Sequence, residues 1–427
     1  MRNLNKKMAT NLTAGATALI LALGLIACSD QPNSDATEAP RTPGITDEYV
    51  RLGSSAPRSG PASAYRVISD SLQVYLEQVN EAGGVKMADG KTRKIEYVAY
   101  DDSYMPDKAV TSVRRLVNND QVFAVFGIVG TATNLAVRDY LNNEEIPQLF
   151  ADSPSSQWGD VENYPWTRGF QPSFGTEAAV YAEYMKSEFP NGKVAILSQN
   201  DDYGLEFVTW FKQAIEGSGL TIVAHETYEM TDPTVAPQVT KLAESEAEIF
   251  LNISTPKASA QAIAKSSELG WNALHFLNRI SAHIGGVFVP AGVDNAKGIV
   301  SAQFFKDPLS EAWQDNKDMK QFKKAVEAAG VNSNDALAVH GWIMAQLLVN
   351  ALERMEEPTR AAFIESVNSY DAFAPKLMLP GITVNTSADD PFAIESLYLQ
   401  QFDGKQWVRL SDEPVSFEGE STVFRKN

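Results

Sequence analysis

The sequence predicts an α/β protein with two doubly wound lobes, each built on a mainly parallel sheet with helices on both faces. Three observations support this prediction. Apolar strand patterns alternate with helical patterns from residue 50, the alternation starts again at residue 193, and roughly 380 residues after position 46 exceed what one hydrophobic core serves. Ligands of such sheets bind beyond the carboxyl ends of the strands, so the residues just after each strand bear most on function.

The first half of the pattern reads strand, helix, strand, helix, strand. Apolar runs of strand length occupy residues 50–56, 95–100 and 122–126. Between them, apolar residues recur at helical spacing over 68–79 and 108–118. This order favours parallel strands, because each helix carries the chain back to the same edge of the sheet.

The second half repeats this order. Strands are predicted at 193–197, 221–224, 249–253 and 274–277, and helices at 205–216, 237–245 and 335–355. A second sheet with its own helices is therefore expected, although periodicity does not show which sheet each strand joins.

The N-terminus has the pattern of an export signal. Arg2, Lys6 and Lys7 precede an apolar run over residues 14–27, and the run ends at Cys28, the only cysteine of the chain. An apolar run of about 14 residues is too short to span a membrane. We therefore expect residues 1–27 to be a signal peptide.

The segment Leu25-Ile26-Ala27-Cys28 resembles a bacterial lipobox. The resemblance implies that Cys28 is lipidated and that the protein is a periplasm-facing lipoprotein, anchored to a bacterial membrane through the lipid alone. Residues 28–46 are rich in Pro, Ser, Asp and Thr, which predicts a disordered tether. The alternative is an ordinary secretory signal with an incidental cysteine.

Charge and cysteine content exclude several classes of function. The net charge is −18, and removal of residues 1–27, which carry three positive charges, leaves −21. Phosphate backbones repel such a body, which argues against nucleic acid as a partner. With no cysteine after Cys28, disulfides within the chain and cysteine-based zinc sites are excluded, and no cofactor is expected.

Several motifs then resemble one family in order and spacing. They are Ser59–Tyr65, Asn80–Val85, Tyr100–Asp102, Pro147–Phe150, Pro165–Pro172, Gln199–Gly204 and Phe402–Lys405. Together they resemble the type I periplasmic binding proteins of the leucine/isoleucine/valine-binding family over nearly all of residues 47–410.

The resemblance implies a hinged clamshell that captures a small-molecule solute for an ABC permease in the inner membrane. It also implies a monomer in which each lobe is built from two separate stretches of chain. Lobe 1 would comprise residues 47–170 and 300–385, lobe 2 would comprise 171–299 and 386–412, and 413–427 would be a C-terminal tail.

Two loops of lobe 1 are the main candidates for binding an oxyanion. The first contains Val129, Gly130 and Thr131 after a strand, and the second contains Ser155 and Ser156. Glycines allow a ligand to approach the backbone, and hydroxyls at a helix start donate to anions. Simple helix capping is the alternative for either loop alone, and the match of both loops to ligand-contacting loops of the family favours binding.

Aromatic and polar residues after other strands complete the predicted site. Tyr65 and Tyr203 would form its walls, Ser254 would add a hydroxyl from lobe 2, and Arg279 would be able to pair with a carboxylate. Trp158 and Arg58 are further candidates, for which packing and solvent exposure are the alternatives.

Two positions bear on the solute class. Ile280 stands where amino-acid-binding members of the family have the glutamate that holds the ligand ammonium, which disfavours branched-chain amino acids and favours an apolar or aromatic carboxylate. Asp152 stands where a small residue is usual, and it is able to replace the missing glutamate. The solute class is therefore left between amino-acid-like molecules and carboxylates without an amine.

No motif of an enzyme is present. The sequence contains no Gly-x-Ser-x-Gly, His-Glu-x-x-His or Gly-x-Gly-x-x-Gly, and its four histidines are scattered. We expect a binding protein. The remaining alternative is the ligand-sensing component of a receptor, which would need a separate signalling partner.

Overall fold

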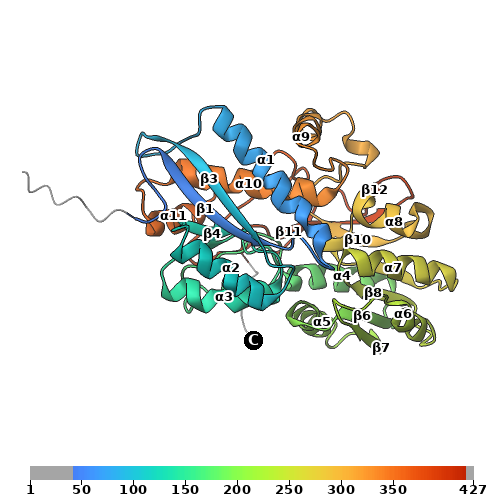
Figure 1. Ribbon diagram of the computed structural model, residues 1–427. Helices are drawn as coiled ribbons and strands as arrows, with labels where there is room; N and C mark the ends of the chain where they lie inside the picture. Colours follow the sequence, from blue (N-terminus) through green and yellow to red (C-terminus); the bar gives the residue numbers. More distant parts are fainter. Residues whose placement is uncertain (1–41, 420–427) are drawn as a thin grey trace, which may run out of the picture. The chain divides into compact units, whose positions relative to one another are not determined.

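Two β-sheets organise the part of the chain that the computed structural model describes, residues 42–419 (Figure 1). The α/β fold with two sheets, predicted from the alternation of patterns, is confirmed. The predicted signal peptide, Cys28 and most of the predicted tether lie outside the described residues, as do residues 420–427 of the predicted tail.

The first sheet has the strand order β2-β3-β1-β4-β5, and all of its pairs except β2–β3 are parallel. Its strands are β1 (Tyr49–Ala56), β2 (Val85–Lys86), β3 (Thr92–Asp101), β4 (Ala124–Phe126) and β5 (Gln148–Leu149). The helices of this lobe are α1 (Arg66–Glu81), α2 (Pro106–Asn118), α3 (Thr131–Asn143), α9 (Lys317–Ala328), α10 (Ala336–Arg354) and α11 (Arg360–Val367).

Helices cover both faces of this sheet (Figure 1). Helices α1 and α10 pack against each other on one face, and α2 and α3 pack against each other on the opposite face. Strand β4 lies between these two layers and is fully buried, which explains its continuous apolar run.

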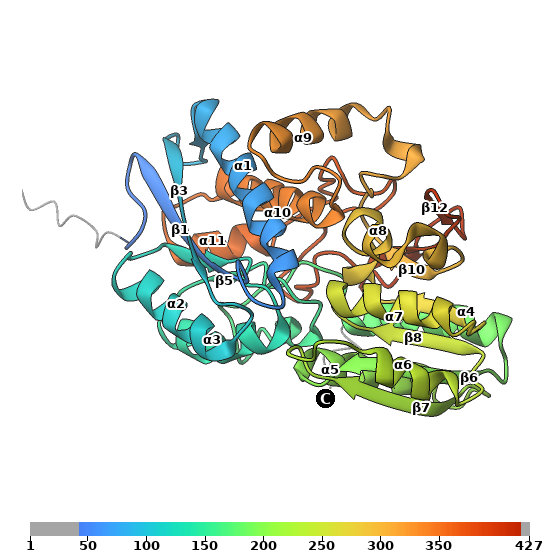
Figure 2. The same ribbon diagram turned by 45° about the vertical axis from the view of Figure 1, so that its right-hand side comes forward.

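The second sheet has the order β12-β11-β10-β9-β8-β6-β7, with β13 paired to β11. Its strands are β6 (Lys193–Gln199), β7 (Thr221–Tyr228), β8 (Ile249–Ile253), β9 (Leu274–Leu277), β10 (Val300–Gln303), β11 (Ser396–Phe402), β12 (Trp407–Arg409) and β13 (Val415–Ser416). The helices of this lobe are α4 (Phe174–Glu188), α5 (Asp202–Ala214), α6 (Ala236–Ala243), α7 (Pro256–Glu268) and α8 (Val289–Ala291). Helices α6 and α7 cover one face of the sheet, while α4 and α5 cover the other (Figure 2).

The pairing of strand β10 differs from the predicted lobe boundary at residue 300. Strand β10 pairs with β9 and β11, so residues 300–303 belong to the second sheet, whereas the sequence analysis placed residue 300 onward in lobe 1. Strands β11 and β12 return to the second sheet within residues 386–412. Strand β13 extends this pairing into the predicted tail, because residues 415–416 pair with β11.

Helix α10 is the buried centre of lobe 1. It is long and apolar enough to cross a membrane by composition, but most of its side chains are buried inside the protein, as expected for the core helix of a folded lobe. Gly341 lets α10 approach α1 closely, because a Cβ at this position would overlap the backbone carbonyl of Ile68. The hydroxyl of Ser71 on α1 donates to the carbonyl of Ala338 at 2.6 Å at the same contact.

We predict that Gly341→Ala lowers the free energy of unfolding by up to about 2 kcal/mol. The added methyl group would force the two backbones apart at a cost of about 1–3 kcal/mol, and the gain in helix propensity of about 1 kcal/mol recovers only part of it. Urea unfolding measures the difference. Glu353→Ala, at an exposed position of the same helix, is the control and should change stability by less than about 0.5 kcal/mol. Equal stability of the two variants would contradict the prediction.

Candidate functional site

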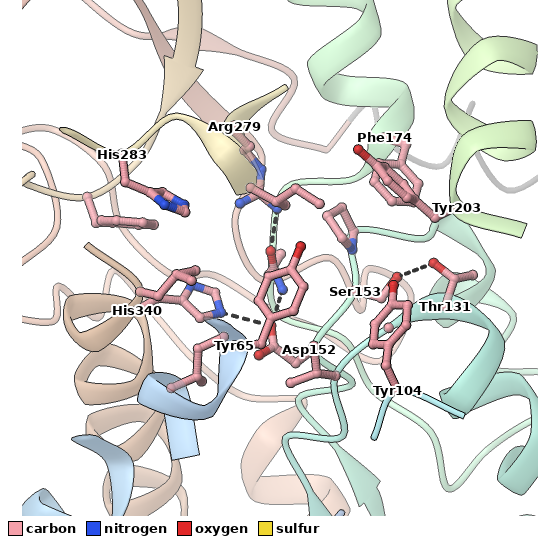
Figure 3. A pocket seen from close by; sticks show the side chains of 18 residues that line it. Tyr65, Tyr104, Thr131, Asp152, Ser153, Phe174, Tyr203, Arg279, His283 and His340 are labelled. Atoms are coloured by element: carbon pink, nitrogen blue, oxygen red, sulfur yellow. Dashed lines mark hydrogen bonds and ion pairs between the residues drawn. The ribbon is translucent and has the colours of Figure 1, made fainter. Parts of the chain in front are cut away.

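A pocket of about 500 Å³ is lined by residues that follow strands of both sheets (Figure 3). Loops after β3, β4 and β5 contribute from the first sheet, and loops after β6, β9 and β10 contribute from the second. The lining residues are Tyr65, Ile68, Tyr104, Val129, Gly130, Thr131, Asp152, Ser153, Pro154, Gln171, Phe174, Tyr203, Arg279, Ile280, His283, Phe305, Leu337 and His340.

Most of the residues predicted for the site line this pocket. They are Tyr65, Val129, Gly130, Thr131, Tyr203 and Arg279. Ile280 and Asp152, the two positions that bear on the solute class, line it as well. Three predicted residues, Ser155, Ser156 and Ser254, are buried but do not line it.

Ser155 and Ser156 hold a carboxylate of the chain itself. The hydroxyl of Ser155 donates to Glu206 Oε2 at 2.6 Å, and the backbone N–H and hydroxyl of Ser156 both donate to Oε1 at 2.7 Å. Glu206 lies on α5, so these bonds join the loop after β5 to the second lobe. Burial raises the pKa of Glu206, and its bonds to the serines and to Trp210 oppose that rise. The predicted oxyanion-binding hydroxyls are thus occupied by Glu206.

The other predicted residues outside the pocket have structural partners. The hydroxyl of Ser254 bonds to Ser259, at 2.7 Å. The indole N–H of Trp158 donates to the carbonyl of Ser153 at 2.7 Å, which supports the pocket wall from behind. Arg58 forms an ion pair with Asp70 at 2.8 Å.

Asp152 is part of a chain of buried polar groups. Its Oδ1 accepts hydrogen bonds from Gln171 Nε2 and from His340 Nε2, the latter at 2.8 Å. Since a carboxylate oxygen only accepts, His340 carries its proton on Nε2. Gln171 Oε1 in turn accepts from Arg279 Nη2 at 2.5 Å. Figure 3 shows Asp152, Arg279 and His340 converging on the pocket from loops of both lobes and from α10.

The second carboxylate oxygen of Asp152 has no hydrogen-bond partner among the described residues. Oδ2 is buried, and the side chain lines the pocket. Leaving a charged acceptor unpaired in the protein interior is costly, so the position of Oδ2 favours a ligand with a hydrogen-bond donor, above all a cation.

Arg279 is held by a buried ion pair with Glu177. Its Nε lies 3.6 Å from Glu177 Oε2, and its backbone N–H donates to Oε1 at 2.7 Å. Burial raises the pKa of Glu177 and lowers that of Arg279, and each charge opposes the shift of the other. The guanidinium also lies over the ring of Phe304, 5.3 Å from its centroid. Nη1 has no hydrogen-bond partner among the described residues and remains a donor for a ligand.

The N-terminus of α3 offers a second set of donors. Gly130 precedes the helix with φ of +102°, and no side chain caps the first turn. The first backbone N–H groups of a helix lack partners inside the helix and attract anions. The hydroxyls of Thr131 and Ser153 bond to each other at 2.6 Å beside this end. A carboxylate of a ligand would fit here.

Aromatic rings form the walls of the pocket. Tyr65 and Tyr104 stack with centroids 6.1 Å apart, and Tyr203 packs against Phe174 at 5.2 Å. Gly130 is required beside them, since a Cβ there would lie 2.6 Å from the ring of Tyr104. The hydroxyl of Tyr203 is buried without a hydrogen-bond partner among the described residues. The walls therefore suit an apolar body with a polar group near Tyr203.

Sequence reasoning missed Tyr104, Gln171, His283 and His340. His340 lies in the apolar pattern of a core helix, where nothing local indicates a site. Gln171 lies in the motif Pro165–Pro172. It bridges Asp152 and Arg279, and Arg279 is more than a hundred positions away in the sequence. Tyr104 was detectable in principle, because it follows β3 directly in the polar run that begins at Asp101.

We predict that His283 makes the protein less stable in mild acid. Burial lowers the pKa of His283 to about 4, the carbonyl of Ile280 opposes this shift, and no hydrogen bond to either ring nitrogen forms within the described residues. The unfolded chain, with a histidine pKa of about 6.5, binds the proton first. The contribution of His283 to the free energy of unfolding is therefore fully present above pH 6.5 and is lost as the pH falls toward 4.

Urea unfolding at pH 7 and pH 5 tests this contribution. The loss of stability between the two values should be smaller in His283→Phe than in the unaltered protein by about 2 kcal/mol. His225→Asn, at an exposed strand position where burial lowers the pKa less, is the control. An equal loss in the His283→Phe variant and the unaltered protein would show that His283 contributes nothing to the acid sensitivity.

The chain is similar in sequence to a known family and to known proteins. The model of the periplasmic binding protein family matches residues 49–406. Leu/Ile/Val-binding protein homolog 3 of Brucella melitensis is 28% identical over 203 residues, which cover 47% of this chain and 53% of that protein. The leucine-, isoleucine-, valine-, threonine-, and alanine-binding protein of Pseudomonas aeruginosa is 23% identical over 205 residues, which cover 46% and 52%. The matched part thus spans about half the length of these curated relatives.

Solved structures share the fold over most of the chain. A branched-chain amino acid ABC transporter protein of Thermus thermophilus with bound valine has a TM-score of 0.78 at 18% identity, covering 89% of this chain and 99% of that one. A fatty acid ABC transporter substrate-binding protein of Thermomonospora curvata has a TM-score of 0.74 at 20% identity, covering 88% and 94%. Because the family model matches most of the chain, the chain belongs to the periplasmic binding protein family.

Proposed function

We propose that this protein is an extracytoplasmic solute-binding protein that captures an amino-acid-like solute with an apolar side chain and delivers it to an ABC importer. Family membership supports the solute-binding role, and the names of the relatives, which include both amino acid and fatty acid binding, leave the solute class open. The choice between these classes rests on the pocket itself.

The unpartnered Oδ2 of Asp152 carries the proposal for an amino-acid-like solute. Ile280 supplies no charge at the position of the usual glutamate, which by itself favours a carboxylate without an amine. Asp152 changes this balance, because its buried Oδ2 would pair with an ammonium group and gains nothing from a purely anionic solute. In this arrangement Asp152 takes over the role of the absent glutamate from the opposite lobe.

The other groups of the pocket fit the rest of such a solute. The first turn of α3 and Nη1 of Arg279 would hold the carboxylate. Tyr65 and Phe174 would pack against the apolar side chain. Contacts from both lobes to one solute would favour the state in which the lobes lie together, and this state would dock on the permease.

We predict that leucine binds more tightly than 4-methylpentanoate, which has the same carbon skeleton without the amine, and that Asp152→Asn removes the difference. Asparagine keeps an oxygen for Gln171 and His340 but places an N–H₂ where Oδ2 stands. Loss of the charge-assisted bond of about 1.5–3 kcal/mol should weaken leucine binding roughly 10- to 100-fold. Isothermal titration measures both ligands.

The outcomes separate the solute class from the transport role. Tight 4-methylpentanoate binding that Asp152→Asn leaves unchanged or strengthens would replace the amino-acid-like solute with an apolar carboxylate. Ser254→Ala, outside the pocket, is the control and should leave both affinities unchanged. Uptake of the bound solute by cells that lack this protein tests delivery, and undiminished uptake would contradict the transport role.

We also propose that Cys28 anchors the mature protein to a membrane. The lipobox-like segment and the polar tether behind it support this proposal. Two or more acyl chains give stable attachment, whereas a single chain binds only marginally. The tether would let the folded body, from about residue 47, reach a permease in the inner membrane.

We predict that Cys28→Ala releases the protein from the membrane fraction or leaves it unprocessed with its signal peptide. Membrane fractionation and the mass of the N-terminal peptide measure the outcome. Ser29→Ala, next to the proposed cleavage point, is the matched control and should remain lipidated. A processed Cys28→Ala protein that still sediments fully with membranes would show that the anchor lies elsewhere.

A further inference from the structure

A second cavity of about 630 Å³ lies in lobe 1, away from the pocket described above. Helices α1, α9 and α10 and the segment at residues 376–377 form its walls. Two aromatic side chains pack against Trp342, which meets Tyr75 at 4.9 Å and Phe322 at 5.4 Å, both edge to face. The cavity shares no lining residue with the first pocket.

A buried amide of this cavity has an N–H₂ group without a partner. Gln346 is only 7% exposed, and its Nε2 makes no hydrogen bond to any described residue. Its Oε1 accepts from the backbone N–H of Lys376 at 3.2 Å. A flipped amide would place N–H₂ against that N–H, two donors facing each other, so the orientation of Gln346 is determined.

Other polar groups at the cavity are also hydrogen-bond donors. The indole of Trp342, which lines the cavity, carries an N–H donor. Lys376 lies 3.9 Å from Asp318 in a loose and largely exposed ion pair, so its ammonium group is free to turn toward a ligand. The walls of the cavity are aromatic and favour a planar molecule. Its polar groups are mainly donors, and its carboxylate, Asp318, is paired with Lys376, so the cavity favours a molecule that accepts hydrogen bonds.

We propose that this cavity is a second small-molecule site, which binds a small planar or aromatic molecule through a carbonyl or carboxylate oxygen held by Gln346 Nε2. A single water molecule would also satisfy Gln346, but it would fill only a small part of the space and leave the partly exposed ring of Tyr75 uncovered. The site is independent of the proposed transport function, because no residue of the first pocket takes part.

Three probes of similar shape test the chemistry of the site. Benzamide and benzoate carry the oxygen acceptor, and benzylammonium carries only donors. The full chain is labelled with 5-fluorotryptophan, and Trp342→Phe identifies the resonance of Trp342 among the seven tryptophans. Millimolar benzamide or benzoate should shift this resonance, and benzylammonium should not. Binding of one acceptor and not the other would identify the neutral or the anionic form as the ligand.

Gln346→Glu is the deciding variant. It keeps the oxygen for the N–H of Lys376 and replaces the free N–H₂ with a second oxygen, so the affinity for benzamide should fall about tenfold or more. Asp152→Asn, in the first pocket, should leave the benzamide affinity unchanged. If Gln346→Glu does not fold, Ala82→Trp at the exposed rim should block binding by filling the cavity.

Two results would overturn the proposal. No shift of the Trp342 resonance with benzamide or benzoate would mean that only water occupies the cavity. A shift that is equal in the unaltered protein and in Gln346→Glu, or one that benzylammonium also produces, would show that Gln346 does not select an oxygen acceptor.

Discussion

The pocket depends on the two hydrogen bonds that Asp152 Oδ1 accepts in the protein interior. Gln171 and His340 donate them, and Gln171 is tied in turn to Arg279. These four residues come from the loop after β5, the crossover between lobes, the loop after β9 and helix α10. Removing the carboxylate would leave two polar side chains, Gln171 and His340, buried without this partner, so the contact between these segments depends on one oxygen atom.

A buried chain of charges is a poor way to gain stability. Desolvation of Arg279 and Glu177 costs about as much as their attraction returns, and apolar residues of similar size would pack there at no such cost. The chain instead places the carboxylate of Asp152 and the guanidinium of Arg279, which carry opposite charges, among the groups that line the pocket. A zwitterionic solute needs one negative group for its ammonium and one positive group for its carboxylate. An apolar core would provide neither.

The sequence was sufficient to predict the fold, and several of the residues that it predicts for the site line the pocket. Strands such as 122–126 are apolar runs between two helical patterns, and loops after strands of a parallel sheet must meet at one edge. Thr131 and Arg279 were found by this rule. His340 was not, because its partner Asp152 is 188 positions away and joins it only through tertiary packing. Residues 300–303, which the family resemblance placed in lobe 1, form strand β10 of the second sheet, because its pairing with β9 and β11 is not encoded in its own pattern.

The serine loop shows why residue type alone misplaces an anion site. Hydroxyls and N–H groups of Ser155 and Ser156 do bind a carboxylate, as their chemistry predicts, but the carboxylate belongs to Glu206. The start of α5 is occupied in the same way, because Asp201 accepts from the first backbone N–H groups of that helix.

Two of the donor sets around the cleft are therefore satisfied from within the chain. The first turn of α3, beside Thr131, keeps its donors free of any side-chain cap. Because a helix N-terminus without a cap favours an anion, and Asp152 Oδ2 in the same pocket favours a cation, the two unsatisfied ends of the pocket have opposite preferences. A solute with both charges satisfies both ends at once, whereas a simple carboxylate satisfies one and leaves the buried oxygen of Asp152 unpaired.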